Sequence, residues 1–278
     1  MKFLVPTDFS DNAFHAAVYA VTLAKAKPGS SIHLLHVLTP VINDPVLIGD
    51  IVEEAVKSLE KIKVELKSRC SSCSISHSVK IGDTVSEIIK KANELNSGVV
   101  VMGIQGLDKT RRFFFGSNSR SLVDKATCPV LVIPETSVLK APQKIVFATD
   151  YYDSDLEALQ RLVPIAAAFN SEIVMVHIFD ECDEEQSELI MMNFISNEIF
   201  KTIDYPHITY RVYYNERTSE GLKSFSESTG ADLVVLSARK QNVFQKLFTK
   251  SVTKELAYNS GVPLLIFHVH KTGDPAFL

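Results

Sequence analysis

The sequence predicts an α/β fold with two tandem domains, each built from a five-stranded parallel sheet with helices on both faces. Three observations support this prediction. The chain has 278 residues, about twice the length of an ordinary domain. Its two halves align almost throughout, at an offset that drifts from 142 to 134 residues. Within each half, short β-branched apolar runs alternate with longer amphipathic stretches, which is typical of buried parallel strands joined by crossover helices.

The elements of the first half follow from this alternation. The apolar runs predict strands at 2–6, 31–37, 74–80, 98–102 and 129–133. The stretches between them predict helices at 11–27, 50–68, 84–95 and 118–126. In the second helix, apolar residues recur at three- and four-residue steps: Ile51, Ala55, Leu59, Ile62 and Leu66. Because Glu and Lys lie opposite this stripe, the helix is expected to pack one face against the sheet and not to enter a membrane.

The second half repeats the first. KFLVPTDFS at 2–10 matches KIVFATDYY at 144–152, and CPVLVI at 128–133 matches VPLLIF at 262–267. The segment PETSVLKAPQ between the halves carries a Pro near either end, which is typical of a linker. The expected organisation is a first domain at 1–137, a linker at 138–143 and a second domain at 144–278.

Composition and charge exclude several classes of protein. The formal net charge is −4 and there is no run of five or six like charges, so we expect no binding to nucleic acid. No apolar run approaches the roughly 18 residues that span a bilayer, and the amino terminus lacks the apolar segment of a signal peptide. Four Cys in 278 residues do not predict a disulfide scaffold. We expect a cytoplasmic protein without membrane contact.

A glycine-rich motif follows the fourth predicted strand. Gly103, Gly106 and Gly116 are separated by two and by nine residues, and Ser117 comes directly after the last glycine. A strand that runs into a glycine turn, with hydroxyls at the start of the next helix, lets backbone N–H groups approach a phosphate closely. The spacing therefore predicts a phosphate-binding turn.

This motif resembles the ATP-binding branch of the universal stress protein family, whose pattern is Gly, two residues, Gly, nine residues, Gly, then Ser or Thr. The resemblance also covers Pro6-Thr7-Asp8, the His36-Val37 pair and the segment 126–130 before the last strand. It spans both halves of the chain. The fold it implies is doubly wound, flavodoxin/Rossmann-like and similar to the adenine nucleotide alpha hydrolases, with strand order 3-2-1-4-5 in each domain.

The resemblance also implies a role for each residue of the motif. Asp8 would accept a hydrogen bond from the adenine amino group, and Val37 would offer main-chain contacts to the base. The full expected nucleotide-binding set is Pro6, Thr7, Asp8, Val37, Met102, Gly103, Gln105, Gly106, Gly116, Ser117, Asn118 and Ser119. Taken singly, these residues also fit a plainer reading, since glycines end strands and Ser or Asp cap helices. The expected ligand is ATP, with AMP and ADP left open, and Mg²⁺ could accompany the phosphates.

The second half departs from this motif. By register, Ser237, Lys240 and Lys250 stand where the first half has its three glycines, while Asp150 is retained. A Cβ at such a position blocks close approach of the backbone to a phosphate. We therefore expect one nucleotide site, in the first domain, and a second domain that does not bind ATP.

Cys70 and Cys73 form a C-x-x-C pair outside the glycine motif. A redox pair of the thioredoxin kind opens a helix after a strand, whereas this pair is predicted to close a helix before a strand. A metal site would need more ligands at suitable spacing. Two loop cysteines that join in air remain the plainer alternative.

The function expected from these features is a regulatory or sensor module that binds an adenine nucleotide. No nucleophile with its base is recognisable, so an enzyme is not expected, although slow ATP hydrolysis stays open. The alternatives are an adenylating or ATP-hydrolysing enzyme of the same fold class, and a flavin-binding subunit similar to electron-transfer flavoproteins. The resemblance further implies that the last strands, 129–133 and 263–267, pair to form an internal pseudo-dimer. We also expect a homodimer of the whole chain.

Overall fold

The computed structural model describes residues 1–39, 44–104, 117–179, 184–239 and 261–269. The chain divides into two compact units, Met1–Ala141 and Pro142–Leu278. This division falls within the linker expected at 138–143. Each unit is described by itself below.

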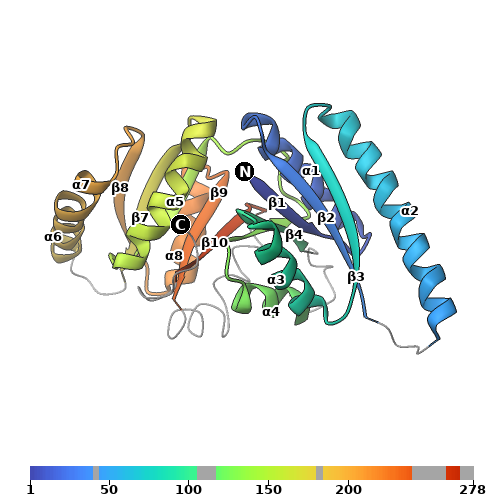
Figure 1. Cartoon of the computed structure of the whole chain (residues 1–278). Coiled ribbons are helices and arrows are strands. Elements are labelled where there is room, and N and C mark those ends of the chain that lie inside the picture. The colour runs from blue at the N-terminus through green and yellow to red at the C-terminus, as the bar shows by residue number, and fades with distance from the viewer. Residues whose placement is uncertain (40–43, 105–116, 180–183, 240–260, 270–278) are drawn as a thin grey trace. The chain divides into compact units, whose positions relative to one another are not determined.

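The first unit contains a five-stranded parallel sheet (Figure 1). Its strands are β1 (Lys2–Pro6), β2 (Ser31–Leu38), β3 (Ser74–Ile81), β4 (Val99–Ile104) and β5 (Val130–Pro134). They lie in the order β3-β2-β1-β4-β5, and every neighbouring pair is parallel. The expected strand order 3-2-1-4-5 is therefore confirmed. The switch point of the sheet lies between β1 and β4: β2 and β3 lie on one side of β1, and β4 and β5 lie on the other.

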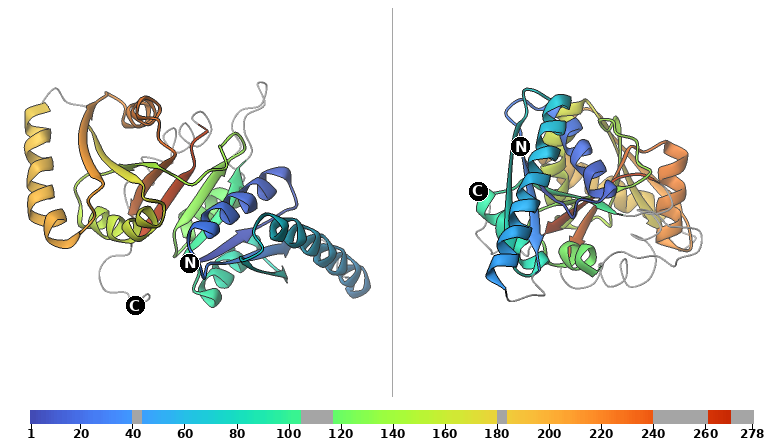
Figure 2. Two further views of the ribbon diagram at one scale, coloured as in Figure 1. Left: turned by 90° about the horizontal axis from the view of Figure 1, so that it is seen from above. Right: turned by 90° about the vertical axis from the view of Figure 1, so that its right-hand side faces the viewer.

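Four helices cover the two faces of this sheet. They are α1 (Asp11–Ala26), α2 (Pro45–Arg69), α3 (Thr84–Leu95) and α4 (Ser117–Lys125). Contacts between α1 and α2 and between α3 and α4 place one pair on each face (Figure 2). The central strands are buried on both sides: the neighbouring residues Leu4 and Val5 of β1, and Val100 and Val101 of β4, are all at most 1% exposed. Burial on both faces explains why these strands are continuous apolar runs in the sequence.

The predicted start of the second helix, at residue 50, is wrong. α2 begins five residues earlier because Asp44 caps it: the Asp44 carboxylate accepts hydrogen bonds from the N–H groups of Val46, at 2.9 Å, and Leu47, at 3.4 Å. Pro45 occupies the first helical turn, where its missing N–H is tolerated. Within the described ranges, no helix has both the length and the apolar character needed to cross a bilayer.

The second unit repeats the topology. Its strands are β6 (Lys144–Ala148), β7 (Glu172–Phe179), β8 (Ile208–Tyr214), β9 (Leu233–Arg239) and β10 (Leu264–Val269), in the order β10-β9-β6-β7-β8 and all parallel. Its helices are α5 (Asp153–Phe169), α6 (Glu184–Phe194), α7 (Phe200–Thr202) and α8 (Thr218–Thr229), and a π-helical turn at Ile195–Ile199 joins α6 to α7. The segment that would correspond to α4 lies outside the described residues.

The side chain of His33, a residue of β2, contacts the neighbouring strand β3. The two ring nitrogens of His33 lie 2.8 Å from the hydroxyl oxygens of Ser76 and Ser78. Burial and the positive charges of Lys91 and His77 together lower the pKa of His33 to about 4, against the opposing effect of Glu94. The folded protein therefore keeps this ring neutral under conditions in which the unfolded chain binds a proton.

We expect the first unit to lose stability as the pH falls from about 6.5 toward 4, because the depressed pKa of His33 stabilises the fold only above the ordinary value near 6.5. Urea unfolding at pH 7, 6 and 5 measures this loss. His33→Gln keeps a donor and an acceptor for the two serines but cannot titrate, so its stability should fall less over the same range. Equal losses in the two proteins would contradict the assignment.

Candidate functional site

A cavity of about 460 Å³ lies at the carboxyl ends of the strands in the first unit. It is bordered by the ends of β1, β2 and β4 and by the first turns of three helices, α1, α3 and α4. This is the point where the strand order reverses, which is where doubly wound sheets bind ligands. Its lining residues are Pro6, Thr7, Asp8, Ser10, Asn12, Ala13, Leu35, His36, Val37, Thr84, Ile88, Met102, Gly103, Ile104, Asn118, Ser119 and Leu122.

The structure brings most of the predicted site residues to this one cavity. Those that line it are Pro6, Thr7, Asp8, Val37, Met102, Gly103, Asn118 and Ser119. Ser117 is the first residue of α4 but does not line the cavity. Gln105, Gly106 and Gly116 lie outside the described residues, as do Lys240 and Lys250 at the corresponding positions of the second half.

Sequence reasoning predicted the contribution of the start of α4 but missed that of the starts of α1 and α3. Ser10 and Asn12 begin α1, and Thr84 begins α3, and all three line the cavity. Ser10 and Asp83 are N-caps, so both starts could have been found from the capping pattern. The sequence alone does not show that the first turns of α1, α3 and α4 border the same cavity. Their proximity follows from the strand order.

Asp8 is held in place just beyond the carboxyl end of β1. Its Oδ1 atom accepts hydrogen bonds from the Ser10 backbone N–H at 3.0 Å and from the Ser10 hydroxyl at 2.5 Å. The Ser10 oxygen in turn accepts from the N–H of Ala13, at 3.3 Å, and so caps α1. Among the described residues, none donates a hydrogen bond to the second carboxylate oxygen of Asp8. Asp8 is therefore fixed through one oxygen and can offer the other to a ligand.

A strained turn shapes the same corner of the cavity. Phe9 has a φ of 68°, which a residue with a Cβ seldom adopts. Its N–H donates to the Thr7 hydroxyl at 3.0 Å, and its ring lies 4.3 Å from the ring of His36. The Nδ1 atom of His36 lies 2.7 Å from the Thr7 carbonyl oxygen, and because a carbonyl only accepts, Nδ1 carries the proton. These contacts hold the turn against its strain, which is of order 1–3 kcal/mol.

The second unit contains the same turn. Tyr151 has a φ of 62°, its N–H donates to the Thr149 hydroxyl at 3.0 Å, and its ring lies 4.7 Å from the ring of His177. The Nδ1 atom of His177 lies 2.8 Å from the Thr149 carbonyl oxygen. The turn is therefore present in both halves, including the one that lacks the glycines.

Gly103 has a packing role that the sequence motif does not reveal. A Cβ at this residue would lie 2.1 Å from the carbonyl oxygen of Asn12 and 3.1 Å from the backbone nitrogen of Ala13. The first turn of α1 thus lies directly against the backbone of β4. Only glycine permits this approach, which brings Asn12 and Ala13 to the cavity wall. The φ angle of Gly103 is not positive, so its backbone conformation does not by itself require glycine.

In the second unit, two polar side chains meet at the corresponding place. Ser237 stands at the position of Gly103, and Asp155 stands at that of Ala13. Asp155 is 2% exposed, and its Oδ1 accepts a short hydrogen bond from the Ser237 hydroxyl. Its Oδ2 accepts from the Thr149 hydroxyl at 3.0 Å and from the N–H groups of Asp150, at 2.9 Å, and Tyr152, at 3.3 Å. The carboxylate therefore fills the space beside β9 and is fully used within the protein.

Fold and cavity together define a class: a tandem doubly wound α/β protein with a small-molecule cavity at the switch point of its first sheet. The universal stress protein family matches residues 1–134 and 142–268. The chain belongs to this family, with one family domain in each half.

Individual relatives agree with this assignment. A universal stress protein of Methanocaldococcus jannaschii is 28% identical over 140 residues, which are 48% of this chain and 81% of that protein. One from Thermus aquaticus is 30% identical over 135 residues, or 47% of this chain and 96% of that protein. The crystal structure of a universal stress protein from Archaeoglobus fulgidus has a TM-score of 0.77 at 18% identity and covers 98% of this chain and 97% of its own. This last likeness extends the shared fold over both halves.

Proposed function

We propose that the first domain binds an adenine nucleotide, ATP in the first place, and that the protein acts as a regulatory or sensor module. The observation that carries the proposal is the cavity of about 460 Å³, to which β1, β2 and β4 bring the half-fixed carboxylate of Asp8 and the backbone of Val37 and Gly103. Its volume lies within the range of small-molecule sites, about 300–1,000 Å³.

The helix starts support the placing of an anionic ligand here. The first turns of α1, α3 and α4 all border the cavity, and each carries the positive end of a helix dipole together with N–H groups that no intrahelical carbonyl takes up. Asn118 and Ser119 of α4 add an amide and a hydroxyl. Phosphates suit the α4 end of the cavity, beside Asn118 and Ser119, whereas the apolar side chains of Met102 and Ile104 of β4 suit the adenosine.

We infer binding without efficient catalysis. At the α4 end, Asn118 and Ser119 can donate hydrogen bonds but cannot serve as a general base near neutral pH. Among the described residues, no group of three or more His, Cys, Asp or Glu side chains is placed to hold a metal ion. A Mg²⁺ ion at this site would therefore rest mainly on the phosphates of the nucleotide.

We propose that the second domain binds no nucleotide in this way, because Ser237 and Asp155, hydrogen-bonded to each other, stand where Gly103 and Ala13 let the first turn of α1 lie against β4. The second domain then serves as a structural partner of the first. Pairing of the two final strands, and a homodimer of the whole chain, stay predictions.

The ligand can be identified from the purified protein. We expect denaturation of freshly purified protein to release ATP, AMP or ADP, identified by mass spectrometry. Nucleotide turned over at many cycles per minute would favour the enzyme of the same fold class instead. A yellow protein with flavin absorbance would favour the flavin-binding alternative.

Asp8→Asn is expected to weaken ATP binding about ten-fold or more and to reduce the preference for ATP over GTP, because an amide N–H₂ would face the adenine amino group. Titration calorimetry with both nucleotides measures this change. Asp11→Asn, which removes a carboxylate from the exposed first turn of α1 outside the cavity lining, is the matched control. Equal affinities of wild type and Asp8→Asn, with preference for ATP intact, would remove Asp8 from the site.

A further inference from the structure

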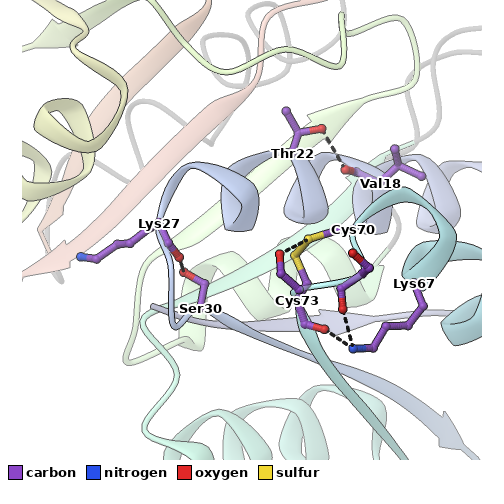
Figure 3. Close-up of a disulfide and its surroundings, with 9 residues drawn as sticks. Val18, Thr22, Lys27, Ser30, Lys67, Cys70 and Cys73 are labelled. Atoms are coloured by element: carbon purple, nitrogen blue, oxygen red, sulfur yellow. Dashed lines mark hydrogen bonds between the residues drawn. A yellow bond between two sulfur atoms is a disulfide. The ribbon is translucent and has the colours of Figure 1, made fainter.

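A disulfide joins Cys70 to Cys73 in the first unit (Figure 3). Cys70 is the C-cap of α2, and Cys73 directly precedes β3, so the predicted position of the pair between a helix and a strand is confirmed. Both residues are buried, at 5% and 4% exposure. The bond lies at the amino end of β3, whereas the cavity lies at the carboxyl ends of the strands. The disulfide therefore lies apart from the proposed nucleotide site.

The turn that carries the disulfide is also held by hydrogen bonds. The N–H of Cys73 donates to the carbonyl oxygen of Cys70 at 3.3 Å, and the N–H of Cys70 donates to that of Leu66 at 3.1 Å. The ammonium group of Lys67 donates to the carbonyl oxygen of Cys73 (Figure 3) and to that of Ser71. None of these hydrogen bonds involves a sulfur atom. We therefore expect the turn to keep the two thiols close together after reduction.

We propose that Cys70 and Cys73 form a reversible redox site whose reaction partner is a dithiol. In the reduction, a thiolate of the partner attacks one cysteine sulfur, the Cys70–Cys73 bond breaks, and the displaced cysteine sulfur takes up a proton. The second thiol of the partner then attacks the mixed disulfide. The partner leaves as a disulfide and the second cysteine is released as a thiol, so that two electrons and two protons pass to the pair. Oxidation by a disulfide runs through the same steps in reverse.

Two features select a dithiol over a monothiol. A mixed disulfide with a monothiol is reversed at once, because the freed cysteine lies only three residues from its partner within a hydrogen-bonded turn. In addition, burial and the negative end of the α2 dipole disfavour a thiolate at Cys70, which favours the closed form. A dithiol escapes the first obstacle, since its own second thiol completes the exchange.

The experiment uses the full-length protein in its native state. The protein is equilibrated without oxygen with dithiothreitol or with glutathione at the same thiol concentration, then alkylated, and the modified cysteines are mapped by mass spectrometry. We expect dithiothreitol to open Cys70 and Cys73 together, oxidised dithiothreitol to close them again, and glutathione to open at least ten-fold less of the pair. Cys70→Ser assigns the signal, since it leaves Cys73 as a thiol that cannot close within the turn.

Two results would overturn the proposal. If dithiothreitol opens the pair only after the protein is unfolded in urea, the bond is a permanent link between α2 and β3. If glutathione opens it as readily as dithiothreitol does, the pair does not select dithiols. Cys128 lies outside the disulfide and, unlike Cys70 and Cys73, does not border exposed turn residues. It should stay unmodified in every native sample and serves as an internal control for unfolding.

Discussion

Gly103→Ala is expected to destabilise the first domain by about 3 kcal/mol or more and to abolish its nucleotide binding. The added methyl group would lie 2.1 Å from the carbonyl oxygen of Asn12, which is backbone and cannot rotate away. Relief requires α1 to move off β4. That movement displaces Asn12 and Ala13, which both line the cavity, so stability and binding should fail together.

Thermal unfolding and ATP titration of the variant measure these effects, and the melting temperature should fall by about 10 °C. Two glycines of the same unit serve as controls. A Cβ at Gly98 would meet its nearest atom, in the Met1 side chain, at 3.5 Å, and one at Gly49 in α2 would meet nothing within 4 Å. Gly98→Ala and Gly49→Ala should therefore be harmless or slightly stabilising. If Gly103→Ala behaves as they do, the close contact of α1 with β4 is not what requires a glycine.

Asp155→Asn is expected to cost the second domain about 3 kcal/mol. The carboxylate is buried and accepts from two hydroxyls and two backbone N–H groups. An amide keeps only one accepting oxygen, which can take the place of Oδ2, and its N–H₂ group then faces the Ser237 hydroxyl. The three hydrogen bonds to that oxygen lose the strength that the negative charge gives them, and the Ser237 hydroxyl must turn its hydrogen away. The start of α5 should loosen together with its contact to β9.

Hydrogen exchange read by mass spectrometry locates the effect, since peptides from β6, α5 and β9 should exchange faster while those of β1 to β5 stay unchanged. Asp153→Asn is the matched control: it removes an exposed carboxylate two residues away, from the first turn of the same helix. It should lose only a few tenths of a kcal/mol of interaction with the helix dipole. Equal effects of the two substitutions would show that the buried hydrogen bonds contribute little.

The strands were predictable because parallel strands buried on both faces leave continuous apolar runs, and the internal repeat presents each run twice. Their order was expected from the resemblance to the universal stress protein family, not from these runs. The start of α2 was predictable in principle, since Asp44 followed by Pro45 is an N-terminal signal that outweighs the weaker apolar stripe. Helix boundaries set by one capping side chain are easily missed when periodicity alone is read.

The predicted site residues that border the cavity all come from the carboxyl ends of strands or from the start of α4. A parallel sheet gathers such ends along one edge, so their proximity follows from the fold. The packing role of Gly103 was not predictable, because it depends on the distance between Asn12 and β4. Nor was the contact of Asp155 with Ser237, which are 82 residues apart in the chain.

The turn that contains Phe9 in the first half and Tyr151 in the second allows the two halves of the chain to be compared directly. The chain contains two copies of the same domain, one with the three glycines of the motif and one without them. The strained turn, its threonine and its stacked histidine occur in both copies, so the turn forms with or without the glycines. The pair of Gly103 and Ala13 occurs in only one of the two copies. An engineer who wished to give the second half a binding site would leave the turn alone and begin at Asp155 and Ser237.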